Sequence, residues 1–181
     1  MSRVPDLPLE GLTPEQKRVH DQIAGTRGGV VRGPFAIWLR HPALADRANQ
    51  FGNALRLDGK LDKRLFELMV LIVARRWSAQ YEWFAHEQAG LQAGLLPEVV
   101  EAIRNRGLPD FARDDERLVY EIITELTETR TLSQASYDRA LAALGLDLLI
   151  ELITAAGFYT LVAMMLNAFD APVPGGARPL G

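Results

Sequence analysis

Glu82 and His86 have the spacing of two neighbours on one face of a helix. Residues four apart in an α-helix lie side by side, so these side chains would be adjacent if the surrounding segment is helical. A carboxyl group beside an imidazole can orient or transfer a proton, which makes the two residues candidates for general acid–base catalysis. The structural alternative is a glutamate favoured by the dipole at a helix start and a histidine satisfied within the fold.

Glu67 is a third candidate catalytic residue, because it is the one carboxylate in the apolar run 65–74. An unpaired buried carboxylate is costly, so we expect Glu67 to reach the protein surface or to have a partner. The three candidates could also form a metal site with one another. That hypothesis is the weaker one, because the other histidines, His20 and His41, lie at no familiar metal-binding spacing. No metal site is therefore predicted.

Arg75 and Arg76 end the same apolar run and are candidates for substrate binding. A guanidinium group can hold a substrate carboxylate through two parallel hydrogen bonds. The alternative role is interaction with the carbonyl groups at the end of a helix. Three aromatic residues, Tyr81, Trp83 and Tyr159, are further candidates for lining a substrate pocket, although aromatic side chains more often belong to the core.

The elements that would position these residues are all helical. Thr13-Pro14-Glu15-Gln16 combines an N-cap, a proline at the first helical position and a capping-box glutamine, so it predicts a helix over about residues 13–25. Gly90, inside a predicted helix, indicates close contact with another helix. No alternating strand pattern occurs, so the fold class is all-α. The further predicted helices cover about residues 42–55, 62–76, 78–94, 97–107, 113–130, 133–145 and 147–169.

Two segments lie outside this pattern. Residues 32–42 combine turn residues with large apolar ones, which predicts a loop packed over the core. The tail, residues 170–181, is rich in proline and glycine and predicts an extended arm that is disordered or laid over a neighbouring subunit.

Length and composition favour one globular domain over residues 1–181. The chain is 48% apolar and 24% charged, carries a net charge of -3 and contains no cysteine. The small charge argues against nucleic acid and anionic membranes as partners and favours a small-molecule substrate. No secretory signal is visible, so a cytoplasmic location is expected. Residues 148–169 are apolar enough for a membrane span, but the polar residues among them favour a buried helix.

The run from Leu65 to Gly94 resembles the carboxymuconolactone decarboxylase family, which includes the alkylhydroperoxidase D proteins. The matching features are the apolar helix with Glu67, the Arg75-Arg76 end, the Glu82-to-His86 unit, the Ala-Gly steps at 89–90 and 93–94, and the later helix from Gly157 to Asn167. The resemblance implies a compact alkylhydroperoxidase D-like multi-helix fold with its core over about residues 33–169. It also implies homo-oligomers, often trimers or hexamers.

The peroxidase branch of that family uses a Cys-x-x-Cys pair, and Ala79 and Glu82 occupy the matching positions here. Dithiol peroxidase chemistry is therefore impossible for this chain. The decarboxylase branch has a glutamate four residues before the histidine, as this chain does.

The resemblance thus implies a cofactor-independent lyase or decarboxylase acting on a small carboxylated lactone or a related intermediate of aromatic degradation. His86, oriented by Glu82, would donate the proton, and Glu67 would be a second proton carrier. One alternative is a non-catalytic oligomeric scaffold that binds a small molecule. Another is a thiol-independent peroxide-related protein, which would need a metal or haem.

Overall fold

The computed structural model describes residues 2–181, and every regular element in that range is a helix. The predicted all-α fold class is confirmed. Contacts divide the chain into two compact units. The first contains the residues up to Gly59 together with Met165–Pro172, and the second contains Lys60–Met164 together with Val173–Gly181. The single domain expected over residues 1–181 stays a prediction.

In the first unit, helices α1 (Pro14–Thr26) and α2 (Pro34–Trp38) pack on α3 (Pro42–Arg56). The predicted capping box at the start of α1 is confirmed, because the Thr13 hydroxyl accepts a hydrogen bond from the Gln16 backbone N–H and the Gln16 side chain accepts one from the Thr13 N–H. The segment 32–42 is not the loop that we predicted. It contains the short helix α2, because its apolar residues follow a proline at the first helical position and bury their side chains.

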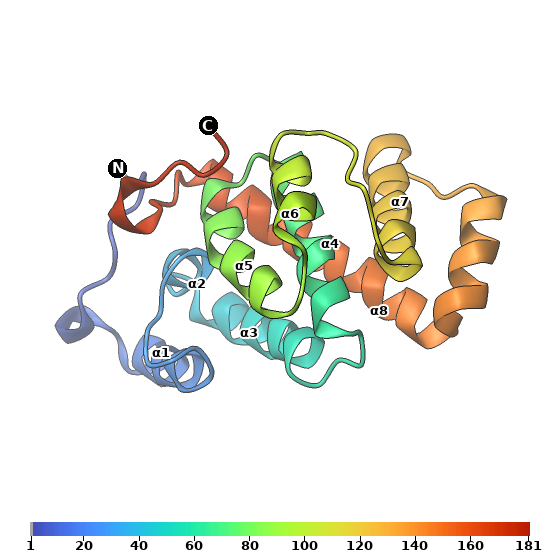
Figure 1. Cartoon of the computed structure of the whole chain (residues 1–181). Helices are drawn as coiled ribbons and strands as arrows, with labels where there is room; N and C mark the ends of the chain where they lie inside the picture. Colours follow the sequence, from blue (N-terminus) through green and yellow to red (C-terminus); the bar gives the residue numbers. More distant parts are fainter. Residues whose placement is uncertain (1) are drawn as a thin grey trace. The chain divides into compact units, whose positions relative to one another are not determined.

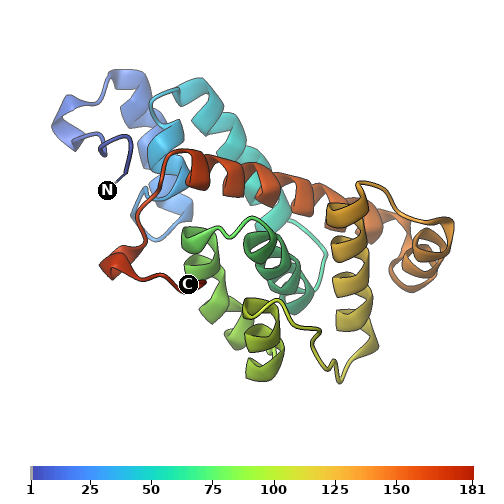
Figure 2. The same ribbon diagram turned by 90° about the horizontal axis from the view of Figure 1, so that it is seen from above.

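The second unit is built around α4 (Lys63–Arg76), as Figures 1 and 2 show. Helix α4 lies between α5 (Gln80–Gln92) and α7 (Asp114–Thr129), and it also contacts α6 (Pro97–Arg104). All of its residues from Arg64 to Ala74 are buried. A helix that is apolar on every side is a core helix, so any charged group on α4 must find a partner inside the fold.

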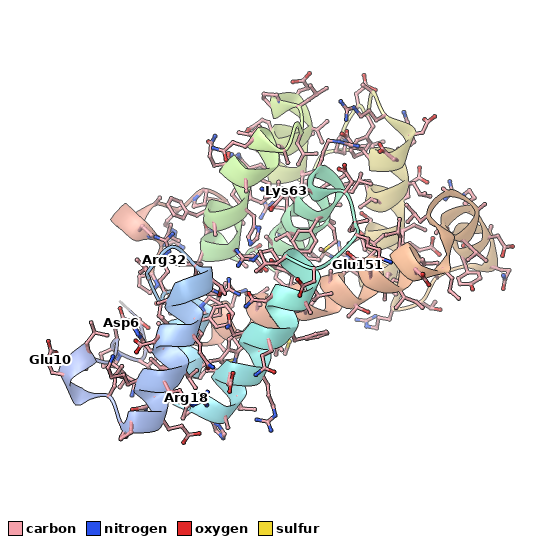
Figure 3. The ribbon with its side chains drawn as sticks, turned by 90° about the horizontal axis from the view of Figure 1, so that it is seen from below. Asp6, Glu10, Arg18, Arg32, Lys63 and Glu151 are labelled. Carbon is pink, nitrogen blue, oxygen red and sulfur yellow. The ribbon has the colours of Figure 1, made fainter. Side chains whose placement is uncertain are left out.

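The ends of α4 are held by polar contacts. The Asp62 carboxylate caps its first turn by accepting hydrogen bonds from the backbone N–H groups of the next residues. Glu151 on α8 (Gln134–Ala168) accepts from the N–H groups of Lys60 and Leu61, just before α4 (Figure 3). These bonds fix the position of the start of α4 relative to Glu151 on α8.

Helix α8 contains a break at Gly145, where φ is 75° and ψ is 167°. The two helices predicted on either side of this glycine are therefore present as two helical segments of α8 that meet at a non-helical residue. By length and composition α8 is the one helix among the described residues that could cross a membrane, with 44% of its most apolar window buried. The core helix of a compact fold passes the same test.

The tail follows a course different from the two that we predicted. Leu180 donates its backbone N–H to the Gln80 side chain, and that side chain donates to the carbonyl of Gly181. Arg104 donates to the Pro179 carbonyl at 2.6 Å. The tail therefore packs against α5 and α6 of its own chain, because amide and guanidinium groups there satisfy its backbone.

Candidate functional site

Glu67 and His86 form the polar centre of the contact between α4 and α5. The distance from His86 Nδ1 to Glu67 Oε2 is 2.7 Å, and the carboxylate is almost wholly buried. An ionised carboxylate can only accept, so Nδ1–H of His86 is the donor when Glu67 carries its charge. His86 Nε2 makes no hydrogen bond with any residue in the described part of the chain. The pair therefore presents one imidazole nitrogen that can exchange a proton with a ligand.

Gly90 makes this close contact possible. A Cβ at position 90 would lie 2.9 Å from Leu95 Cδ1, 3.3 Å from Leu71 Cδ1 and 3.6 Å from the Glu67 Cβ. No real side chain tolerates the shortest of these separations without movement. The predicted close helix contact at Gly90 is confirmed, and it lies one turn beyond His86, where it sets the gap that the hydrogen bond spans.

Tyr159 of α8 lies next to the pair. Its ring meets the His86 ring edge to face, with centroids 5.1 Å apart, and it meets the Phe66 ring at 5.5 Å. The structure thus places Tyr159 beside the predicted catalytic histidine. Contacts of this geometry restrict the orientation of the imidazole.

Glu82 makes no hydrogen bond to His86, contrary to what the sequence led us to expect. Its side chain is 1% exposed, and neither carboxyl oxygen has a hydrogen-bond partner in the described residues. Burial alone raises the pKa of Glu82 well above its usual value, so the group is held neutral over a wide pH range. The prediction that Glu82 orients His86 is wrong, because four-residue spacing places two residues on one helix face but does not direct both side chains at each other. Glu67, on another helix, makes that contact.

Trp83 is a core residue in this structure. The side chain is fully buried, its indole N–H donates to Glu87 at 3.0 Å, and the Arg104 guanidinium lies 5.1 Å from its ring centroid. Arg104 also pairs with Glu87. The predicted substrate contact at Trp83 is therefore corrected to a packing role that joins α5 to α6. Tyr81, on the first turn of α5, is half-buried.

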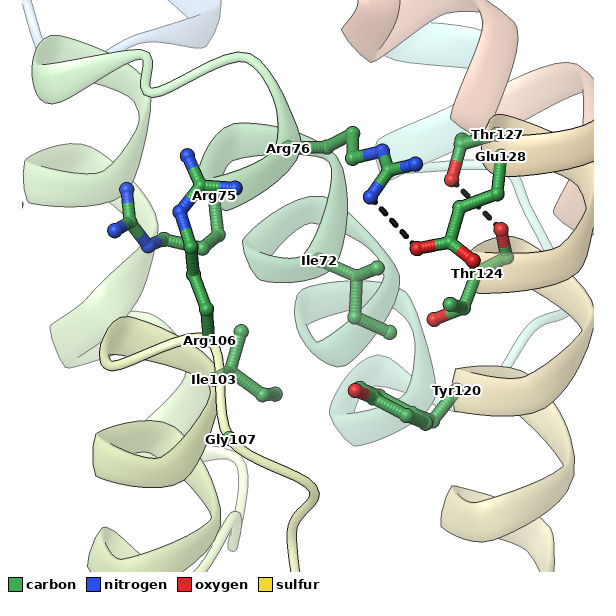
Figure 4. A pocket seen from close by; sticks show the side chains of 10 residues that line it. All are labelled: Ile72, Arg75, Arg76, Ile103, Arg106, Gly107, Tyr120, Thr124, Thr127 and Glu128. Atoms are coloured by element: carbon green, nitrogen blue, oxygen red, sulfur yellow. Dashed lines mark hydrogen bonds and ion pairs between the residues drawn. The ribbon is translucent and has the colours of Figure 1, made fainter.

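Arg75 and Arg76 line a cavity of about 110 Å³ on another side of α4 (Figure 4). Arg76 pairs with Glu128 at 2.8 Å, and Arg75 donates to the Ser78 hydroxyl at 3.3 Å. The lining residues of this cavity include none of the three predicted catalytic residues. The two arginines and the Glu67–His86 pair are thus not brought together there, because their positions on α4 point toward different neighbouring helices. The cavity is lined by Ile72, Arg75, Arg76, Ile103, Arg106, Gly107, Tyr120, Thr124, Thr127 and Glu128.

Sequence reasoning missed Arg106 and Tyr120. Arg106 follows α6 and has a positive φ of 59°, and Tyr120 lies in the middle of α7. Neither residue stands at a helical spacing from Arg75 in the sequence, because each lies on or next to another helix that packs against α4. The Arg106-Gly107 helix end was the only local signal of an unusual backbone.

The comparisons with known proteins agree with this architecture. The carboxymuconolactone decarboxylase family matches residues 42–120. The crystal structure of an uncharacterized peroxidase-related protein from Silicibacter sp. TM1040 superposes with a TM-score of 0.77 at 18% identity, covering 98% of this chain and 94% of that one. At that identity the likeness shows the fold. A search of curated proteins found no match. The matched segment contains Glu67, His86 and Gly90, so the family resemblance expected from the sequence is confirmed: residues 42–120 of this cysteine-free chain are similar to the carboxymuconolactone decarboxylase family.

Proposed function

We propose that this protein is a cofactor-independent lyase that decarboxylates a small carboxylated lactone or a related intermediate of aromatic degradation. The observation that supports this most is the buried hydrogen bond between Glu67 and His86. A carboxylate that holds one imidazole nitrogen leaves the other to act as a general acid. The family match supports the reaction class, and the carboxyl group of the substrate is part of the proposal.

The proposed reaction needs one proton from the protein. The bond between the ring carbon and the carboxylate breaks, carbon dioxide leaves, and the electron pair remains on the carbon in conjugation with the lactone carbonyl. The His86 imidazolium then gives its Nε2 proton to that carbon, and water restores the proton. In this scheme His86 is the catalytic residue and Glu67 is its positioning residue.

Glu82 has a separate role in the proposal. Burial raises the pKa of its carboxyl group, which favours the neutral form that can donate a hydrogen bond. It is the only one of the three candidates without a hydrogen-bond partner in the described residues, so in this proposal it is the donor left for a bound ligand.

The test is ultraviolet-monitored turnover of 4-carboxymuconolactone by the wild-type protein and the His86→Ala variant. We expect turnover by the wild type and a loss of about 10²–10⁴-fold in the variant. His41→Ala is the matched control, because His41 is exposed and its side chain makes no capping bond. Equal rates in the wild type and in His86→Ala would reject this function and favour the non-catalytic scaffold.

We also propose that the protein forms homo-oligomers through α8. Exposed apolar side chains recur along one face of this helix at helical spacing, and Gly157 lies within the same stripe. Its members are Leu146, Ile150, Gly157, Leu161 and Met164. Together with the oligomers that the family resemblance implies, an apolar stripe with a small residue at its middle favours a second copy of the chain as the occupant.

The oligomer proposal predicts that Ile150→Asp lowers the mass of the particle. A carboxylate buried in an apolar contact is costly, so the assembly should dissociate to smaller species. Light scattering after size exclusion measures the mass. Gln134→Asp, at the exposed start of the same helix, is the control. A wild-type monomer, or an unchanged mass in Ile150→Asp, would contradict the proposal.

A further inference from the structure

The cavity beside the end of α4 holds more positive than negative charge. Three guanidinium groups, those of Arg75, Arg76 and Arg106, line it, together with a single carboxylate, Glu128 (Figure 4). The Glu128 carboxylate forms an ion pair with Arg76. Two cations therefore have no charge partner in the cavity.

Arg75 and Arg106 lie close together although they repel each other. Both donate to the same acceptor, the Ser78 hydroxyl oxygen, at 3.3 Å and 3.0 Å. Within residues 2–181 no carboxylate forms an ion pair with either of them. Arg75 Nε is buried without a hydrogen-bond partner. Burial and the Arg106 charge both lower the pKa of Arg75, as expected for a cation that lacks its counterion.

The backbone keeps this arrangement in place. Ser78 has φ of 49° and Arg106 has φ of 59°, a region that residues other than glycine rarely occupy. Both unusual conformations occur at residues that deliver a side chain to the same cluster. Each is the left-handed residue that ends a helix, since the Ala79 N–H bonds the Ala74 carbonyl and the Gly107 N–H bonds the Ala102 carbonyl, and these bonds hold the two residues in place.

The cavity also supplies the other groups that a small anion needs. Tyr120 and Thr124 bring hydroxyl groups from α7, and Ile72 and Ile103 form an apolar wall. The cavity has a volume of about 110 Å³, which leaves room for a small oxyanion between these groups.

We propose that this cavity binds a small oxyanion, a phosphate or a carboxylate group, between Arg75 and Arg106. Two guanidinium groups at one acceptor position are the arrangement that recognises such oxygens in two-pronged fashion. The site is separate from the proton-transfer pair, because Glu67 and Arg75 are eight residues apart on α4, about 12 Å along the helix axis. Anion binding does not depend on the proposed lyase activity.

Isothermal titration calorimetry with inorganic phosphate, and separately with succinate, tests the proposal at constant ionic strength in sodium chloride. We expect saturable one-site binding of at least one anion by the wild type. Arg75→Gln and Arg106→Gln should each weaken it at least tenfold. Arg47→Gln should leave it unchanged, because Arg47 is exposed and bonds only the Ala43 carbonyl. Tighter binding of phosphate identifies a phosphoryl ligand, and tighter binding of succinate identifies a carboxylate ligand.

Two results would overturn the proposal. One is the absence of saturable binding of both anions, and the other is binding that survives both cavity substitutions. Thermal unfolding without added anion guards against loss of fold. Removing one of two repelling cations should leave the melting temperature of Arg106→Gln equal to that of the wild type or raise it. If Arg75→Gln does not fold, Arg106→Gln and Arg75→Lys decide the outcome. Arg75→Lys should weaken anion binding, because the ammonium group of lysine cannot make the two parallel hydrogen bonds of a planar guanidinium group.

Discussion

The charged groups on the two sides of α4 differ in whether the protein supplies them with a partner. Toward α5, Glu67 is buried and hydrogen-bonded to His86 at 2.7 Å. Toward α6 and α7, Arg75 lies beside another cation and has a buried Nε without a partner. A satisfied buried pair can pass a proton without recruiting anything to neutralise it, whereas an unsatisfied cluster is stabilised by a ligand from solution. Under the two proposals made above, one helix would support two kinds of chemistry that differ in the source of the counter-charge.

The largest expected effect tests whether the paired side acts as a unit. Glu67→Gln and His86→Ala should each lower kcat/KM by about 10²–10⁴-fold, and the double variant should lose little more, because neither group works without the other. Steady-state kinetics of the wild type, the two single variants and the double variant measures this. Losses that multiply in the double variant would show that the two groups act independently.

A second effect sharpens the contrast with a paired arginine on the same helix. Arg64 forms ion pairs with Glu116 at 2.5 Å and Asp115 at 2.7 Å, and it is nearly buried. Arg64→Met should lower the free energy of unfolding by about 3–5 kcal/mol, because Glu116 would keep a buried charge without a partner. Urea denaturation measures the loss.

The matched comparison for that effect is the double variant Arg64→Met with Glu116→Leu. Removing both charges leaves neither uncompensated, so it should recover much of the stability. A double variant as unstable as Arg64→Met would show that the side-chain packing of Arg64, and not its charge, is what matters.

The smallest effect concerns Glu82, the exception on the paired side. Burial raises its folded-state pKa above the ordinary value of 4.5, so the folded protein binds a proton that the unfolded chain has released. The contribution of Glu82 to the free energy of unfolding should therefore be greatest below about pH 4.5. It should fall as the pH rises toward the folded-state pKa. Glu82→Met should remove that slope and stabilise the protein near pH 7 by about 1–3 kcal/mol.

Urea denaturation between pH 4 and pH 8 measures the slope, and Glu98→Gln, at an exposed position of α6, is the control. A Glu82→Met variant with the wild-type slope would mean that Glu82 ionises freely in the folded state. In that case the difference between Glu82 and the satisfied Glu67 would disappear.

Local patterns predicted the helices well. The capping box at Thr13, the break at Gly145 and the close contact at Gly90 all depend on neighbours in the chain or on the absence of a side chain, so the sequence carries the information. The helix α2 was missed because turn-forming residues flank it and its stability comes from burial.

The candidate site was predicted less completely. Spacing identified His86, and the apolar run identified Glu67, but spacing paired His86 with Glu82, because a contact between helices depends on packing that spacing within one helix does not encode. The same limit explains why Arg75 was expected beside the catalytic residues and Arg106 was not considered.

Gly90 has a consequence for how chains of this fold can diverge. An added Cβ there would lie 2.9 Å from Leu95 Cδ1 and 3.3 Å from Leu71 Cδ1, so the ends of these side chains, or α5 itself, would have to move. If α5 moves, the two helices can still bury their apolar faces, but the hydrogen bond from His86 to Glu67 becomes longer and weaker. Residue 90 is thus a position at which this hydrogen bond can be weakened while the helical architecture is kept.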